Sequence, residues 1–176
     1  MTPEPVEYEP ISGEIHHHVL SVLVENKAGV LHRVAGLFSR RGFNIYSLAV
    51  APTDPSHKFS RITIVVDAAS APLEQIVNQL DKLINVVEID HVNERQVVER
   101  ELFLATISVS AEEQTAAIAL CANVGAQVVD AGAGEMTVML ADHPDSINAF
   151  QELLGVFRID ELHRTGLVAL PKLSAQ

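Results

Sequence analysis

The sequence has little cysteine, no tryptophan and few basic residues. A single cysteine, Cys121, excludes a disulfide within the chain and a thiolate-rich zinc site. It also favours a reducing compartment, so we expect a cytoplasmic protein. Lys and Arg number 12 against 23 Asp and Glu, which gives a formal net charge of -11. Because such a surface repels duplex nucleic acid, we expect no nucleic-acid partner.

Long apolar runs are also missing. No run approaches the roughly 20 apolar residues that a membrane-spanning helix needs, so we expect no membrane partner. Residues 1–16 are acidic and rich in proline and lack the features of a signal peptide, so we predict a disordered N-terminal tail. What the chain does have is aliphatic residues. Apolar residues make up 48% of it and aromatic residues 5%, so the core must be mainly aliphatic.

Residues 17–92 alternate between strand and helix patterns. Short runs rich in β-branched residues predict strands at 18–24, 43–51, 59–67 and 85–92. Two stretches between them carry apolar residues at helical spacing, one ending at Gly42 and one starting at Pro72. Their apolar stripes are Val30, Leu31, Val34, Leu37 and Phe38, and Leu73, Ile76, Val77, Leu80 and Leu83. The order β-α-β-β-α-β is typical of ferredoxin-like folds.

Residues 100–171 repeat this order. We predict strands at 100–110, 126–131, 136–142 and 157–170, and helices at 112–124 and 143–155. The segment from Gly42 to Ile45 corresponds to the segment from Gly125 to Val128, which supports an internal repeat. We therefore predict an α+β protein of two tandem ferredoxin-like βαββαβ domains at 17–92 and 100–171. A charged linker at 93–99 would join them, and a short tail at 172–176 would follow.

The loop before the first helix is suited to a small zwitterion. A helix start presents free N–H groups and a partial positive charge, and Gly29 lets a carboxylate approach them closely. The amide of Asn26 can donate and accept, and Val30 and Leu31 offer an aliphatic wall. The alternative is that Asn26 and Gly29 serve only the turn. Pairing of two such sheets in a dimer would bring this loop near Asn44 and Ile45 of the other subunit.

The stretches "LSVLVENKAGVLHRVAGLFSRRGFNIYSLAVAPT", "SRITIVV" and "LEQIVNQLDKLINVVEI" closely resemble the regulatory small subunits of acetohydroxyacid synthase, also called acetolactate synthase. "VERELFLATISV" and "IDELHRTGLVAL" are similar to that family's junction and C-terminal end. The resemblance implies that the first domain is an ACT domain, an amino-acid sensor that forms a homodimer. Where the family often has an acidic residue, this chain has Tyr46.

The resemblance also implies a function. A subunit of this family has no catalytic residues and binds no cofactor of its own. It activates a catalytic large subunit that uses thiamine diphosphate, Mg and FAD, and it confers feedback inhibition by valine or another branched-chain amino acid. By motif match, the effector site comprises Asn26, Gly29, Val30 and Leu31 of one subunit with Asn44 and Ile45 of the other.

Three alternatives remain open from the residues. A stand-alone ACT-domain sensor would act on a different partner. An enzyme would need a nucleophile, but no Gly-x-Ser-x-Gly motif is present and Cys121 lies in an apolar helix. A metal site at His16, His17 and His18 is disfavoured because neighbouring residues of a strand point to opposite faces. We therefore predict no metal site.

Overall fold

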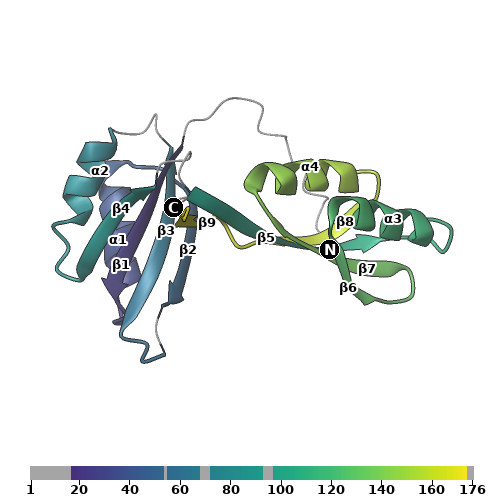
Figure 1. Cartoon of the computed structure of the whole chain (residues 1–176), viewed down its shortest axis with the longest axis horizontal. Helices are drawn as coiled ribbons and strands as arrows, with labels where there is room; N and C mark the ends of the chain where they lie inside the picture. Colours follow the sequence, from purple (N-terminus) through teal and green to yellow (C-terminus); the bar gives the residue numbers. More distant parts are fainter. Residues whose placement is uncertain (1–16, 54, 68–71, 93–96, 174–176) are drawn as a thin grey trace, which may run out of the picture.

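The computed structural model describes residues 17–53, 55–67, 72–92 and 97–173. These residues form two α+β units, each an antiparallel sheet with two helices on one face (Figure 1). The first sheet has four strands, and the second has four in the same arrangement and a fifth that pairs with one of them. The predicted tail at 1–16 and residues 93–96 of the predicted linker lie outside the described residues, as do residues 174–176.

The first unit runs β1 (His17–Glu25), α1 (Val30–Arg41), β2 (Ile45–Pro52), β3 (Phe59–Asp67), α2 (Leu73–Leu80) and β4 (Val86–Val92). Its strand order is β2-β3-β1-β4, and every pair is antiparallel. This is the predicted ferredoxin-like arrangement. α1 ends as predicted at Gly42, whose left-handed backbone (φ 71°) lets its N–H reach the last turn of the helix. α2 ends earlier than its apolar stripe suggested, so Leu83 lies beyond the helix.

The first core lies between this sheet and its helices. Alternate residues of β1 and β3 face α1 and α2, as the period of a strand requires. The aliphatic side chains carry most of this core, with Phe38 and Phe43 in edge-to-face contact. The buried members are Leu20, Val22, Val24, Val30, Val34, Leu37, Phe38, Phe43, Ile62, Ile64, Val66, Ile76 and Leu80.

The second unit repeats the first. It runs β5 (Val97–Ser108), α3 (Gln114–Val124), β6 (Gln127–Ala131), β7 (Glu135–Asp142), α4 (Pro144–Leu154) and β8 (Arg158–Arg164), with the order β6-β7-β5-β8. A ninth strand, β9 (Val168–Pro171), follows. The two-domain α+β prediction is therefore confirmed. The second core again sits under the helices, around the contact of Phe103 with Phe150.

The single last strand predicted at 157–170 is wrong. The chain turns at Thr165–Leu167, where Gly166 has a φ of +79° that favours glycine. β8 pairs with the second half of β5, whereas β9 pairs with its first residues, Val97–Arg100. Residues 97–99, placed in the linker by the sequence, are therefore strand. Their charge pattern concealed an alternation of buried and exposed positions.

β5 connects the two units along one face. Its odd-numbered residues from Phe103 onward enter the second core, and Val97 on the same face packs against the open face of the first sheet (Figure 1). We call this contact the junction cluster. It comprises Val19, Val65, Val97, Leu167 and Ala169. Because Glu99 and Glu101 lie between the two apolar ends of this face, two carboxylates are held at the junction of the units.

Candidate functional site

The loop between β1 and α1 leaves the start of the helix open. Gly29 occupies the N-cap position with a φ of +83°, and no side chain caps the helix. The N–H of Val30 bonds to the carbonyl of Lys27. Leu31 and His32 are the next two helix residues, and their N–H groups have no acceptor one turn earlier. Apart from Gly29 and its two chain neighbours, no described residue has an atom within 4 Å of the place that a Cβ of Gly29 would take, so a ligand can approach the backbone here.

Asn26 holds this loop in place. Its backbone N–H donates to the carbonyl of Lys58 (2.8 Å), and its side-chain Nδ2 donates to the carbonyl of His57 (2.9 Å). These bonds tie the β1–α1 loop to the β2–β3 loop. One N–H of the amide is therefore used within the fold, which fixes the orientation of the amide and leaves its Oδ1 as a hydrogen-bond acceptor. Of the two roles that the sequence allowed for Asn26, turn chemistry and ligand binding, the structure accommodates both.

The two apolar residues that follow differ in their surroundings. Val30 is 5% exposed and belongs to the first core, so only its backbone is accessible from the loop. Leu31 is 42% exposed, and its side chain can form an aliphatic wall beside the helix start. A sequence pattern places both on one helix but does not tell which of them points outward.

Asn44 and Ile45 lie at the opposite end of α1. Asn44 is exposed and accepts a backbone bond from Asp67 (3.2 Å), and Ile45 packs against the first core. A helix of 12 residues is roughly 18 Å long, so a single chain does not bring these residues to the loop. The structure thus unites Asn26, Gly29, Val30 and Leu31, and a site that also includes Asn44 and Ile45 requires a second chain.

A polar network that the sequence did not indicate lies next to this loop. Asn85 is 8% exposed; its Nδ2 donates to Glu25 (2.6 Å), and its Oδ1 accepts from Arg33 of α1 (2.7 Å). The bond from Asn85 and that from Lys27 (3.0 Å) hold the pKa of Glu25 below its usual value. The network joins the end of β1, the loop and α1, so it fixes the angle at which the helix starts.

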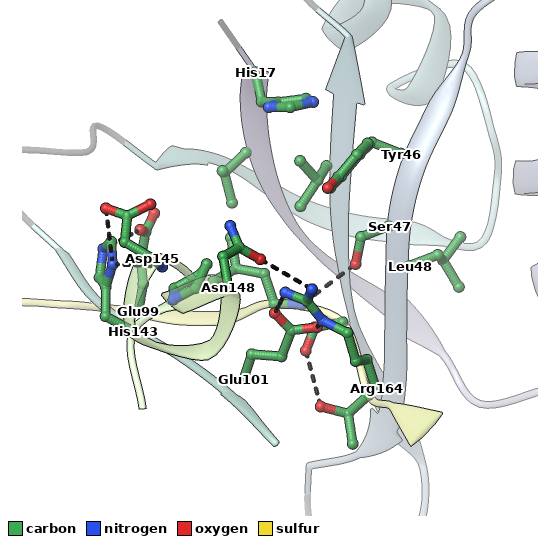
Figure 2. Close-up of a pocket in the computed structure, with 16 residues that line it drawn as sticks. His17, Tyr46, Ser47, Leu48, Glu99, Glu101, His143, Asp145, Asn148 and Arg164 are labelled. Carbon is green, nitrogen blue, oxygen red and sulfur yellow. Dashed lines mark hydrogen bonds and ion pairs between the residues drawn. The ribbon is translucent and has the colours of Figure 1, made fainter. Parts of the chain in front are cut away.

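The junction of the units contains a second polar group. Glu101 is 7% exposed and forms a two-bond ion pair with Arg164 of β8, at 2.7 and 3.0 Å. Hydrogen bonding to Glu101 raises the pKa of Arg164. The pair closes one end of a cavity of about 740 Å³ between the units, which Tyr46 and Ser47 of β2 also line (Figure 2). The one sign of this ion pair in the sequence is Glu101, a charged residue at an inward-facing position of β5.

The remaining candidate residues for metal binding or catalysis do not come together in the structure. His17 stacks on Tyr46 (ring centroids 4.4 Å apart), whereas His18 contacts His91 (6.1 Å), and His16 lies outside the described residues. Within the described ranges, no group of three His, Cys, Asp or Glu side chains could hold a metal ion. Cys121 is buried, and burial raises the pKa of its thiol, which makes it a poor nucleophile. None of the described helices is long and apolar enough to cross a membrane.

Comparisons with known proteins match both units. Residues 20–88 match the model of the acetolactate synthase (AHAS) small subunit-like ACT domain, and residues 100–173 match the model of the small subunit of acetolactate synthase. The acetolactate synthase small subunit of Mycobacterium bovis is 44% identical over 155 residues, which are 88% of this chain and 92% of the relative. The probable acetolactate synthase small subunit of Archaeoglobus fulgidus is 41% identical over 87% of this chain and 95% of its own length.

A solved structure agrees along most of the chain. The crystal structure of the acetolactate synthase small subunit from Thermotoga maritima superposes with a TM-score of 0.84, at 32% identity. The match covers 92% of this chain and 100% of that one, so it includes both units. Fold, sequence and length agree, and the chain belongs to the family of acetolactate synthase small subunits.

Proposed function

We propose that this chain is the regulatory subunit of an acetolactate synthase. It has no catalytic residues of its own, and its partner is a catalytic large subunit that carries thiamine diphosphate, Mg and FAD. It raises the activity of that subunit and makes it sensitive to a branched-chain amino acid, with valine as the effector. Family membership supports the partner. The open start of α1 at Gly29 is the observation that supports the effector site.

The loop offers a complementary group for each part of valine. The free N–H groups of Leu31 and His32, together with the helix dipole, suit the carboxylate. The Oδ1 of Asn26 suits the ammonium group, since the other end of that amide is already fixed. The exposed side chain of Leu31 suits the isopropyl group. A nucleotide phosphate would find no glycine-rich cradle here.

The proposed regulation works through a homodimer of the first units. Asn44 and Ile45 of the second subunit complete the site, because they lie too far from the loop within one chain. Valine bound between two subunits then favours one arrangement of the ACT dimer, and the junction cluster passes this arrangement to the second unit. Couplings of this kind are typically about 1–3 kcal/mol, or 5- to 150-fold in affinity.

Substitution of Gly29 tests this proposal on the holoenzyme, with the chain co-expressed with the catalytic subunit of the same organism. Gly29→Asp puts a negative charge where the carboxylate would bind. The space around the new Cβ is open, and Asp is one of the residues that adopt a left-handed backbone most readily, so the strain is smaller than for most side chains. We expect the subunits to co-purify, basal activation to persist, and the valine concentration for half inhibition to rise by about tenfold or more.

Gly29→Asn is the matched control, because it has the same shape and capping ability but no charge. It should weaken inhibition less than Gly29→Asp, and the difference measures the charge effect. Inhibition by valine at the wild-type level in the Asp variant would contradict the site. Failure of the large subunit to co-purify with the wild-type chain would contradict the partner and favour a stand-alone sensor.

A further inference from the structure

The cavity between the two units has the size and composition of a small-molecule site. Its volume of about 740 Å³ lies within the range of roughly 300–1,000 Å³ that is usual for ligand pockets. β1, β2 and β3 of the first unit form one wall, and β5, the start of α4 and the β8–β9 turn form the other (Figure 2). A molecule bound there would contact both units at once.

The charge of the cavity argues against an anionic ligand. Arg164 is the one Lys or Arg among the described lining residues. Its Nε and Nη2 bond to Glu101, and its Nη1 donates to Asn148 (2.9 Å), so every guanidinium nitrogen is engaged (Figure 2). The cation therefore serves the buried carboxylate of Glu101 and is not available to a ligand.

Glu99, by contrast, lacks a strong partner. Its side chain is only 13% exposed, and its one ion-pair partner among the described residues is the Nε2 of His143 at 3.3 Å. His143 in turn also faces Asp145 at 3.4 Å, so one imidazole is shared between two carboxylates and cannot balance the charge of both. A nearly buried carboxylate whose one ion-pair partner is shared with a second carboxylate leaves negative charge uncompensated, and this favours binding of a cationic group.

The opposite wall of the cavity carries three aliphatic side chains and one imidazole nitrogen without a partner in the described part of the chain. The aliphatic residues are Val19, Leu48 and Val65, and Leu167 of the β8–β9 turn faces the same cavity. His17 lines it too, and its Nε2 is buried without a hydrogen-bond partner in the described part of the chain. An imidazole nitrogen donates or accepts a hydrogen bond according to its protonation, so the wall suits an aliphatic group that carries one polar group.

We infer that this cavity binds a small aliphatic primary ammonium ligand. The carboxylate of Glu99 pairs with the ammonium group, and the valine and leucine side chains cover the aliphatic part. The site is separate from the loop at Gly29 and does not depend on the function proposed above. Because Glu99 belongs to β5 while Val19 and Val65 belong to the first sheet, the bound ligand holds the two units in one relative position.

An NMR titration of the full chain with isobutylamine tests the site. This amine has the branched chain and the ammonium group but lacks the carboxylate that the Gly29 loop needs. We expect saturable shifts of the backbone amides at Tyr46–Leu48 and Gly166–Leu167. In Glu99→Gln, which keeps the shape and removes the charge, the Kd should rise about tenfold or more, because a hydrogen bond to a charged group is lost.

Three controls make the result decisive. Glu112→Gln makes the same chemical change on an exposed carboxylate that does not line the cavity, and it should leave the Kd unchanged. Isobutyrate, which has a carboxylate in place of the ammonium group, should give no saturation. Gly29→Asp should bind isobutylamine as the wild type does. Absence of saturation in the wild type, an equal Kd in Glu99→Gln, or loss of binding in Gly29→Asp would overturn the inference.

Discussion

Glu25 shows how one side chain stabilises the start of α1. Its carboxylate accepts from Asn85 and Lys27, and it ends the strand that leads into the loop. A network of this kind is useful to a binding loop because it fixes the backbone before the ligand arrives. The ordering of the loop is then a cost of folding and not of binding.

The pKa of Glu25 makes this role measurable. Because the pKa of Glu25 is lower in the folded state, its carboxylate stabilises the fold at pH values above the unfolded pKa of 4.5. This contribution is lost as the pH falls through the pKa of the folded state. We expect Glu25→Gln to unfold at a lower urea concentration than the wild type at pH 7. The two proteins should converge in acid, where the wild-type carboxyl is also neutral.

The exposed Glu112 provides the control for this experiment. Glu112→Gln should behave as the wild type at both pH values. A stability difference for Glu25→Gln that stayed the same from neutral to acid pH would show that the charge of Glu25 does not matter.

At this scale the sequence predicted the loop but not its supports. Asn26 and Gly29 were evident because they precede a helical stripe, and a helix start has a known chemistry. Asn85 and Arg33 are 52 residues apart and meet only in the folded chain. The same holds for Glu101 and Arg164, which are 63 residues apart. Side-chain pairs of this kind depend on register, which no local pattern contains.

Among the elements, the β8–β9 turn is the most constrained. Gly166 combines a φ of +79° with a close approach to β2, because a Cβ added here would clash with the Oγ of Ser47. Ser47 also accepts from the N–H of Leu167, so the turn is attached directly to the first unit. An alanine at this position must displace the hydroxyl of Ser47, which breaks its hydrogen bond with Leu167, or move the turn.

We expect Gly166→Ala to lower the free energy of unfolding by about 1–3 kcal/mol, from the backbone strain and the clash together. Urea unfolding followed by circular dichroism measures the change. Gly132→Ala is the control, because no atom lies within 4 Å of its added Cβ and its φ is not positive. Equal stabilities of the two variants would mean that the turn yields without cost.

The elements themselves were largely predictable, and the exceptions have a physical reason. Periodicity placed the helices and most strands, because one face of each is buried on a core. The segment 157–170 alternates and then turns apolar, so it gave no sign of a break at Gly166. The break exists because β8 and β9 pair with opposite ends of β5. β9 pairs with Val97–Arg100, whereas β8 pairs with the second half of the strand.

At the scale of the whole molecule, the proposed effector site belongs to two chains. The loop at Gly29 and the residue Asn44 lie at opposite ends of α1, so a ligand that contacts both must lie between subunits. A symmetric dimer would then hold two equivalent sites, each with the loop of one subunit and Asn44 of the other.

Mixed dimers test this arrangement. Gly29→Asp and Asn44→Asp should each weaken valine binding in a homodimer, because each introduces a like charge at the site. In a dimer of one Gly29→Asp chain and one Asn44→Asp chain, purified with two different tags, one site carries both changes and the other carries neither. We expect calorimetry to find about half of the wild-type sites, with wild-type affinity. A site within one chain would give no recovery.

One face of β5 packs against both units, so this strand fixes how the units are oriented relative to each other. Both the junction cluster and the second core use the odd-numbered residues of this strand, and successive residues of a strand point to opposite faces. Insertion of one residue between Val97 and Phe103 would turn Val97 away from the first unit. Insertion of two would preserve the face and move the units apart by roughly 6–7 Å. Evolution can therefore lengthen or shorten this strand only in steps of two residues, whereas the surface loops can change one residue at a time.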